Sequence, residues 1–271
     1  MILSIHLPFF YRDNNLPPIL SAITAATIII SLLLHELAHI ATVKACGGQV
    51  KKLRIRLLGT TAWVKGLEKL DPWRQYATYL AGPAVNATIA AVAWGRPGFW
   101  QNVFIYNLVL CIFNLLPIFP LDGGRLVQLF LGNRIGILRA NRLLLKSGLA
   151  IGTVLMGLGV VQAVLYPWNV TLLCAGVYVR RKNKQLPTQL YWEFIQAMKA
   201  KLRRNLRVIE LNLPKNMPAT KAVEYLRWNV YAHIKTANSL MISERELLAI
   251  VYPFMHLTHR PQDNENPLPK F

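Results

Sequence analysis

The sequence has few acidic residues. Aspartate and glutamate together number 12, against 31 lysines and arginines, so the formal net charge is +19. A basic excess of this size is compatible with nucleic acid, with an anionic membrane surface, or with the orientation of a membrane protein. The sequence contains no zinc-finger spacing, basic zipper or aromatic-interleaved RNA motif. We therefore expect no nucleic-acid partner.

Cysteine is also scarce. Cys46, Cys111 and Cys174 are far apart and lie in or next to apolar stretches, which supports neither a disulfide framework nor a CxxC metal site. The N-terminus lacks the basic region and the small-residue cleavage site of a secretory signal peptide, so we expect no cleavable signal. Membrane targeting would then depend on apolar segments within the chain.

Long apolar runs, in contrast, are abundant. Apolar residues make up 54% of the sequence, and a helix needs roughly 20 of them to cross a bilayer core. Runs near this length, with a shorter last one, are found at residues 19–46, 76–94, 99–116, 147–166 and 168–179. The predicted fold is mainly α, with a polytopic transmembrane helical core of about five to six spans.

Basic residues predict the orientation of these spans. They concentrate in the connections 46–74 and 125–146 and after residue 180, whereas the opposite connections contain only Arg96. Short loops rich in lysine and arginine stay on the cytoplasmic side. We therefore expect an integral, multi-pass membrane protein whose C-terminus is cytoplasmic.

The last third of the chain differs in composition and predicts a second domain. Residues 207–213 alternate like a strand, 218–229 have helical spacing, and AHIKT reads as a second strand. Ser243 and Glu246 form a capping-box pattern at the start of another helix. We predict a membrane-embedded domain over 1–182, a small cytoplasmic α/β regulatory domain over 183–259, and a flexible tail over 260–271.

A motif of ionisable residues interrupts the first apolar run. His35, Glu36 and His39 form the pattern HELAH at a depth where an unpaired charge is costly. On a helix, His35 and His39 share one face, and two imidazoles at this spacing can bind one Zn²⁺. Glu36 would lie beside them, where a carboxylate can take a proton from water and pass it to a leaving amine. The alternative is a pair of interfacial histidines with a snorkelling glutamate.

A catalytic zinc needs a third protein ligand. One other carboxylate stands beside an apolar segment, Asp122 in FNLLPIFPLDGGRLVQLF (113–130). Prolines interrupt the preceding helix, and Gly123 and Gly124 permit a tight turn, so irregular backbone can carry Asp122 to membrane depth. We predict Asp122 as the third ligand. Alternatively, it is an N-cap for a helix that begins at Arg125.

Asn114 lies in the same apolar run as Asp122. Its amide can donate a hydrogen bond to a substrate carbonyl or to a developing oxyanion. Equally, an asparagine in a membrane helix often bonds a neighbouring helix. The residues leave both interpretations open.

Three motifs together resemble the site-2 protease family of intramembrane zinc metalloproteases: HELAH, AGPAVN (81–86) and NLLPIFPLDGGR (114–125). Their order and spacing are most similar to the branch of stage IV sporulation protein FB, over residues 19–180. The site residues that the resemblance implies, with one zinc per chain, are the zinc ligands His35, His39 and Asp122, the general base Glu36, and the cleft positions Asn114 and Pro120.

The resemblance also implies partners and a location. The substrate would be a membrane-associated pro-sigma factor, cleaved in the mother-cell membrane that surrounds the forespore. Inhibitory membrane proteins and a homo-oligomer are left open as further partners besides the lipid bilayer. Residues 183–259 resemble a CBS module, which implies ATP as a ligand there, although no phosphate-binding signature is visible. The loop 46–74 is too short for the PDZ domain of the anti-sigma-factor-cleaving branch, which favours the sporulation branch.

Two further stretches have a structural and a functional interpretation. LRIRLLGTTAWVKGL (53–67) alternates like a hairpin. It is either a membrane-re-entrant element whose edge pairs with an unwound substrate strand, or an ordinary basic cytoplasmic hairpin. AGPAVN has small residues suited to close helix packing, and we predict a structural role for it.

The leading functional hypothesis is hydrolysis of a peptide bond within or at the membrane. The alternative is a zinc transporter or metal-sensing membrane protein without protease activity. A transporter is expected to place several ligands along a path instead of one triad and a base. A non-catalytic scaffold is disfavoured, because Glu36 has no ligand role and is nevertheless present.

Overall fold

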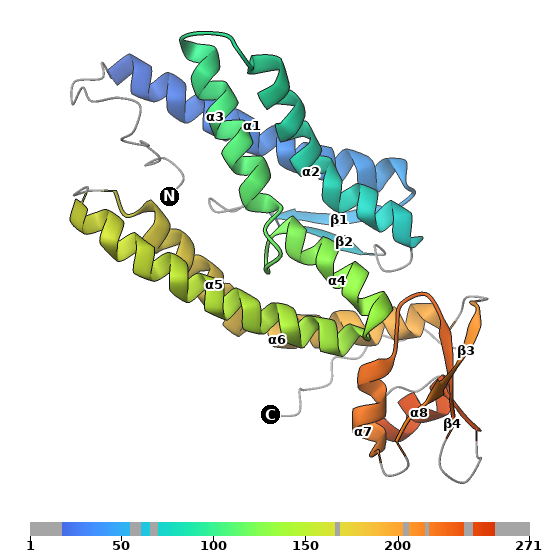
Figure 1. Ribbon diagram of the computed structural model, residues 1–271. Helices are drawn as coiled ribbons and strands as arrows, with labels where there is room; N and C mark the ends of the chain where they lie inside the picture. Colours follow the sequence, from blue (N-terminus) through green and yellow to red (C-terminus); the bar gives the residue numbers. More distant parts are fainter. Residues whose placement is uncertain are drawn as a thin grey trace.

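The computed structural model describes residues 18–54, 61–65, 70–165, 169–202, 206–214, 217–235 and 241–252. These residues are mainly helical (Figure 1). The predicted tail, 260–271, and the segment before Pro18 lie outside the described residues. So does part of the predicted hairpin 53–67.

The first three long helices pack on one another. They are α1 (Pro18–Ala45), α2 (Pro72–Ala93) and α3 (Phe99–Asn114), and α2 contacts both of the others. Between α1 and α2 the chain forms an antiparallel pair, β1 (Gln49–Arg54) and β2 (Thr61–Lys65), with an irregularity between Val50 and Lys52. The three predicted helices are therefore present. The predicted hairpin 53–67 is borne out in its described part, where strand pairing begins at Gln49, four residues before the predicted start.

The next helices form a second group (Figure 1). They are α4 (Asp122–Arg134), α5 (Ile137–Leu165) and α6 (Thr171–Lys201), of which α5 and α6 form a long hairpin. Glycines allow the hairpin to close, because a Cβ at Gly148 would lie 2.3 Å from Oδ1 of Asn183, and one at Gly159 would lie 2.2 Å from the backbone nitrogen of Leu173. Side chains at these positions would force α5 and α6 apart.

The prediction of a tight turn at Gly123 and Gly124 is wrong. Both residues lie within α4, which begins at Asp122 and not at Arg125. A Cβ at Gly123 would lie 2.2 Å from the carbonyl oxygen of Leu115, and one at Gly124 would lie 2.4 Å from that of Ile118. The two glycines therefore let the first turn of α4 press against the backbone that precedes it.

α6 continues well beyond the predicted last span. It runs without interruption through Arg180, Pro187 and the predicted boundary at residue 182, and it ends at Lys201. Its last turns pack Phe194 and Met198 into a core with Leu226 and Leu248. The same helix thus joins the α5–α6 hairpin to the C-terminal region.

The C-terminal region contains a three-stranded sheet and short helices. β3 (Val208–Asn212) pairs parallel with β4 (Tyr231–Lys235), which pairs antiparallel with β5 (Met241–Ser243). In its described residues, the crossover forms α7 (Ala219–Ala222) and the 3-10 helix η3 (Val223–Tyr225), which together are shorter than the predicted helix. The capping box that opens α8 (Glu244–Val251) is confirmed, since Ser243 and Glu246 bond each other's backbone.

A buried ion pair closes this region around the end of α6. Nζ of Lys201 lies 2.5 Å from Oε1 of Glu244, and the two side chains are 3% and 0% exposed. Glu244 also accepts from the backbone nitrogen of Ala232, and Lys201 donates to the carbonyl oxygen of Arg227. Burial lowers the pKa of the Lys201 ammonium and raises the pKa of the Glu244 carboxyl. The opposite charge of the partner reduces both shifts without reversing them.

Two described helices are long and apolar enough to cross a membrane, over residues 26–45 of α1 and 137–165 of α5. Only 22% and 17% of their respective apolar windows are buried. Leu37 is 55% exposed and Val164 is 74% exposed, and many other large aliphatic side chains of these helices are also exposed. A helix in a soluble core would bury such side chains, so this surface indicates contact with lipid.

Candidate metal centre

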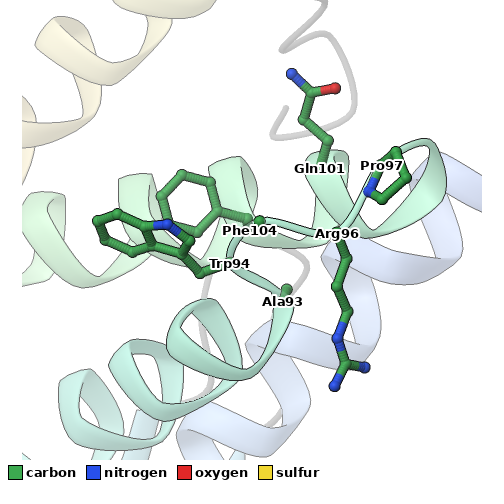
Figure 2. Close-up of a pocket in the computed structure, with 7 residues that line it drawn as sticks. Ala93, Trp94, Arg96, Pro97, Gln101 and Phe104 are labelled. Atoms are coloured by element: carbon green, nitrogen blue, oxygen red, sulfur yellow. The ribbon is translucent and has the colours of Figure 1, made fainter.

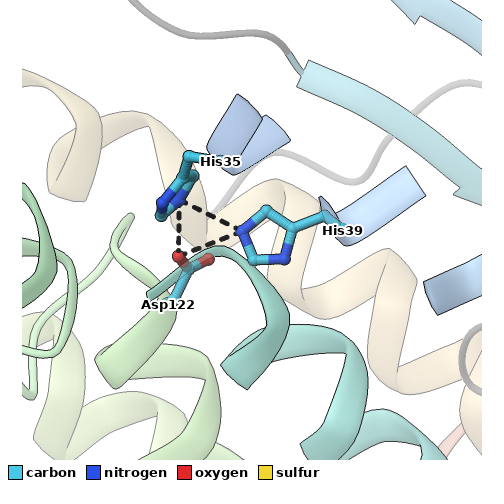
Figure 3. A group of neighbouring side chains, drawn as sticks. All are labelled: His35, His39 and Asp122. Atoms are coloured by element: carbon cyan, nitrogen blue, oxygen red, sulfur yellow. Dashed lines mark hydrogen bonds and ion pairs between the residues drawn. The ribbon is translucent and has the colours of Figure 1, made fainter. Parts of the chain in front are cut away.

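Three predicted ligands converge at one point (Figure 3). Nε2 of His35, Nε2 of His39 and Oδ2 of Asp122 form a triangle in which each pair of atoms is 3.2 Å apart. His35 is buried, and His39 and Asp122 are half-buried. Among the described residues, these three form the one cluster of histidine, cysteine and carboxylate side chains that can hold a metal ion.

Partners on α2 fix the outer nitrogens of both imidazoles. Nδ1 of His39 donates to the carbonyl oxygen of Thr78 at 2.7 Å. A carbonyl oxygen only accepts, so the hydrogen of a neutral His39 sits on Nδ1 and the lone pair of Nε2 faces the triangle. Nδ1 of His35 lies 2.6 Å from Oδ1 of Asn86. Such outer contacts are typical of histidines that bind metals.

The triangle has dimensions that fit zinc. Ligand atoms at about 2.0–2.1 Å from a tetrahedral Zn²⁺ are roughly 3.3–3.4 Å from one another. The observed spacing of 3.2 Å is close to that value. Two imidazole lone pairs and a carboxylate that face each other repel, and a cation between them removes this repulsion. The residues therefore fit a zinc ion that binds three protein atoms and keeps a fourth position open.

A buried segment holds Asp122 in place. Ile118 and Phe119, just before it, are fully buried, and the Phe119–Pro120 bond is cis. Nδ2 of Asn183 on α6 donates to the carbonyl oxygen of Phe119 at 2.6 Å. Asp122 itself is the first residue of α4, so its backbone belongs to a helix and its side chain points to α1.

An ion pair ties the same turn of α4 to α6. The guanidinium of Arg125 donates to both carboxylate oxygens of Glu193, at 2.6 and 3.0 Å. Burial alone would raise the pKa of the Glu193 carboxyl, but the Arg125 charge and the hydrogen bonds from Arg125 and Gln189 together outweigh burial and lower this pKa. The helix that contributes Asp122 is thus fastened to the helix that enters the C-terminal region.

The remaining predicted site residues lie nearby in the chain but outside the triangle. Glu36 is half-buried on α1, directly after His35, and among the described residues no hydrogen bond or ion pair joins its carboxylate to a partner. Its role as general base stays a prediction. Asn114 ends α3, and its Nδ2 donates to the carbonyl oxygen of Leu110 in the same helix. Among the described residues, the Asn114 side chain thus bonds its own helix. The roles of Asn114 and Pro120 in a substrate cleft stay predictions.

Sequence patterns did not predict the contribution of α2 to this site. A Cβ at Gly82 would lie 2.4 Å from Nε2 of His39 and 2.6 Å from Nε2 of His35, so the helix backbone packs directly against both imidazoles. Asn86, four residues later, contacts His35. The motif AGPAVN was the available signal, because a buried asparagine one turn after a small residue marks a polar contact in an apolar helix. Thr78 acts through its backbone and has no such signal.

A pocket at the other end of α2 is separate from the triangle. Figure 2 shows it at the connection between α2 and α3, where Trp94, Arg96 and Phe104 are among its lining residues. It contains none of the predicted site residues. We assign it no role.

Comparison with known proteins agrees with these observations. The sequence model of the protein family Peptidase family M50 matches residues 23–96 and 90–155, a region that contains all three residues of the triangle. The chain belongs to peptidase family M50, the site-2 protease family. A site-2 protease from Methanocaldococcus jannaschii has a similar fold, with a TM-score of 0.52 over 68% of this chain and 85% of that chain, at 23% identity.

Several of the curated relatives are named as zinc metalloproteases. The chain is 34% identical over 160 residues to the putative zinc metalloprotease Rip3 of Mycobacterium tuberculosis, covering 54% of this chain and 40% of that protein. It is 30% identical over 158 residues to stage IV sporulation protein FB of Bacillus subtilis, covering 55% of each. The chain thus spans about half the length of these relatives or less, and the similarity to the sporulation protein is one among several.

Proposed function

We propose that this member of family M50 is an intramembrane zinc metalloprotease that hydrolyses a peptide bond in a membrane-associated regulatory protein. The observation that carries the proposal is the triangle of His35, His39 and Asp122, with Glu36 next to His35 on the same helix. His35, His39 and Asp122 would hold one zinc ion per chain. The names of the curated relatives and the apolar surface of α1 support the same conclusion.

The side chains divide the chemistry between binding and proton transfer. When bound, zinc makes water a better nucleophile at neutral pH and polarises a carbonyl group. Glu36 accepts the proton of the attacking water and passes it to the leaving amine. Asn114 is the last residue of α3, eight positions before Asp122 in the sequence, and we assign it and Pro120 to the substrate cleft.

Access to the site requires an extended substrate. A helix hides each scissile carbonyl in a hydrogen bond to the residue four positions later. β1 begins four residues after the end of α1, the helix that carries His35 and His39. We assign the β1–β2 pair the role of an edge to which an unwound substrate strand pairs.

The substrate and the location rest on the resemblance to the sporulation branch. We propose a pro-sigma factor as substrate and the mother-cell membrane around the forespore as location. Inhibitory membrane proteins and a homo-oligomeric state belong to the same proposal. The relative of Bacillus subtilis, at 30% identity, supports this branch, whereas Rip3, at 34% identity, carries no such implication.

The domain organisation follows from the same proposal. Five to six spans place residues 1–182 in the membrane, with the C-terminus in the cytoplasm, and residues 183–259 form a CBS-like regulatory domain. The parallel β3–β4 pair with a short helical crossover is compatible with half of such a module. ATP as its ligand rests on the resemblance alone.

A zinc transporter is the less favoured function. Transport needs ligands at several depths, whereas the described residues hold a single triad.

Co-expression of the protein with a membrane-tethered candidate substrate tests the proposed protease activity directly. We expect Glu36→Gln to retain zinc and to abolish cleavage. Undiminished cleavage by Glu36→Gln would refute the assignment of Glu36 as the general base.

A further inference from the structure

A hydrogen-bonded network of buried polar side chains connects His35 with α3. Nδ1 of His35 lies 2.6 Å from Oδ1 of Asn86, and Nδ2 of Asn86 donates to Oδ1 of Asn107 at 2.9 Å. Nδ2 of Asn107 donates in turn to Oγ of Ser31 at 3.0 Å. Asn86 and Asn107 are fully buried. This network begins and ends on α1, since Ser31 lies one turn before His35, and it passes through α2 and α3.

The hydrogen bonds of Asn107, at the far end of this network, fix which atoms donate and which accept along it. Nδ2 of Asn107 also donates to the carbonyl oxygen of Val103 at 2.9 Å, and a carbonyl oxygen only accepts. If the amide of Asn107 turned over, its oxygen would face that carbonyl and the bond would be lost. Oδ1 of Asn107 must therefore face Asn86. Asn86 must present its NH₂ to Asn107 and its oxygen to His35.

The orientation of Asn86 decides the tautomer of His35. An oxygen that faces Nδ1 requires the imidazole hydrogen on Nδ1, which leaves a lone pair on Nε2 toward His39 and Asp122. If Asn86 instead presented its NH₂, the hydrogen would move to Nε2 and no lone pair would face the triangle. The choice between these two states is made at Asn107, which contacts neither His35 nor another residue of the triangle.

We propose that Asn86 and Asn107 are positioning residues that select the metal-binding tautomer of His35. The inference rests on the proposed zinc site and adds residues to it that bind neither metal nor substrate. It also gives AGPAVN a role at the site, since Gly82 admits the imidazoles and Asn86 orients one of them.

The chain offers a matched control. Nε2 of Gln128 donates to Oδ1 of Asn141 at 2.8 Å, and both residues are 5% exposed. This buried pair of amides joins α4 to α5, as Asn86 and Asn107 join α2 to α3. Gln128 also accepts from Arg125 and bonds no residue of the triangle. Asn141→Leu therefore removes a comparable buried amide without disturbing the tautomer of His35.

The test measures the dissociation constant of Zn²⁺ for the full chain in detergent, by competition with a chelator. We expect Asn107→Leu to weaken zinc binding about 10- to 100-fold, which is the usual effect of losing the hydrogen-bond partners that orient a metal-binding side chain. Asn141→Leu should leave the constant unchanged. In the Asn107→Leu background, Asn86→Asp should restore most of the affinity, because a carboxylate presents an oxygen to Nδ1 whichever way it is turned.

Each outcome bears on a definite claim. If the wild type binds zinc and Asn107→Leu binds it equally well, the inference is wrong and the zinc site stands. If Asn107→Leu binds weakly and Asn86→Asp restores nothing, Asn107 contributes packing and not orientation, which also overturns the inference. If the wild type binds no zinc, the proposed function fails and the inference fails with it. Should Asn107→Leu not unfold cooperatively, Asn107→Ala serves in the same comparison.

Discussion

His35 and Asp122 bring a ring nitrogen and a carboxylate oxygen to 3.2 Å of one another, although 87 positions separate them in the sequence. The contact depends on three helices. α1 carries His35, the first turn of α4 carries Asp122, and the backbone of α2 at Gly82 lies against the imidazole. Any change that widens the gap between these helices should therefore weaken metal binding before it abolishes the fold.

Gly82→Ala tests this close approach. The added methyl group would meet the imidazoles of His35 and His39 at less than 3 Å, so one ring or α2 must move. Since metal affinity depends on ligand positions within about 0.5 Å, we expect zinc binding to fall by at least tenfold. The measurement is chelator competition on the purified protein.

Gly157→Ala is the matched control for that substitution. Gly157 is exposed on α5, and a Cβ there meets nothing within 4 Å. We expect unchanged zinc affinity and a gain in helix stability of about 0.5–1 kcal/mol. Equal zinc affinities for Gly82→Ala and Gly157→Ala would contradict the packing of α2 against the triangle.

Glu193→Gln tests the tie between α4 and α6. It replaces a charged, bidentate partner of Arg125 with a neutral one, and we expect the free energy of unfolding to fall by about 1.5–3 kcal/mol at neutral pH. Denaturant unfolding in detergent measures this difference. The control is Arg142→Gln, because the Arg142 side chain is 58% exposed and its pair with Glu224 should contribute less than about 1 kcal/mol.

The effect of Glu193→Gln should also depend on pH. The pKa of Glu193 is lowered in the folded protein, so its contribution is fully present above the ordinary glutamate value of about 4.3 and is lost as pH falls through the folded value. The difference between wild type and variant should therefore shrink below about pH 4. A difference that grows on acidification would contradict the ion pair.

The buried pair of Lys201 and Glu244 calls for a double-mutant cycle. Lys201→Met leaves a buried carboxylate without its cation and should destabilise the protein by about 3–5 kcal/mol. Lys201→Met combined with Glu244→Gln should cost less, because no charge remains and the glutamine can still accept from Ala232. If the double variant is the less stable one, the pair is not the dominant interaction there.

Local sequence patterns were sufficient for part of the site. The convergence of His35 and His39 follows from helical spacing, since residues four apart lie on one face whatever the rest of the chain does. The long helices follow from the length of the apolar runs. The structure brings Asp122 to the two histidines, as expected from the need for a third ligand.

Other features depend on contacts between distant segments, which local patterns do not contain. Gly123 and Gly124 suit a turn by propensity, but they are needed inside α4 because Leu115 and Ile118 press against it. α6 extends far past Arg181 because its polar continuation packs into the C-terminal core. The partner of His39 is the backbone of Thr78, and a backbone carbonyl leaves no trace in the sequence.

The central claim is that His35, His39 and Asp122 together bind one zinc ion. The most direct measurement is the zinc content of the purified protein, by elemental analysis, for the wild type and for Asp122→Ala after identical dialysis against a weak chelator. We predict one zinc per chain in the wild type and a large loss in Asp122→Ala, because two imidazoles alone hold zinc poorly. Full zinc occupancy without Asp122, or none in the wild type, would contradict the account.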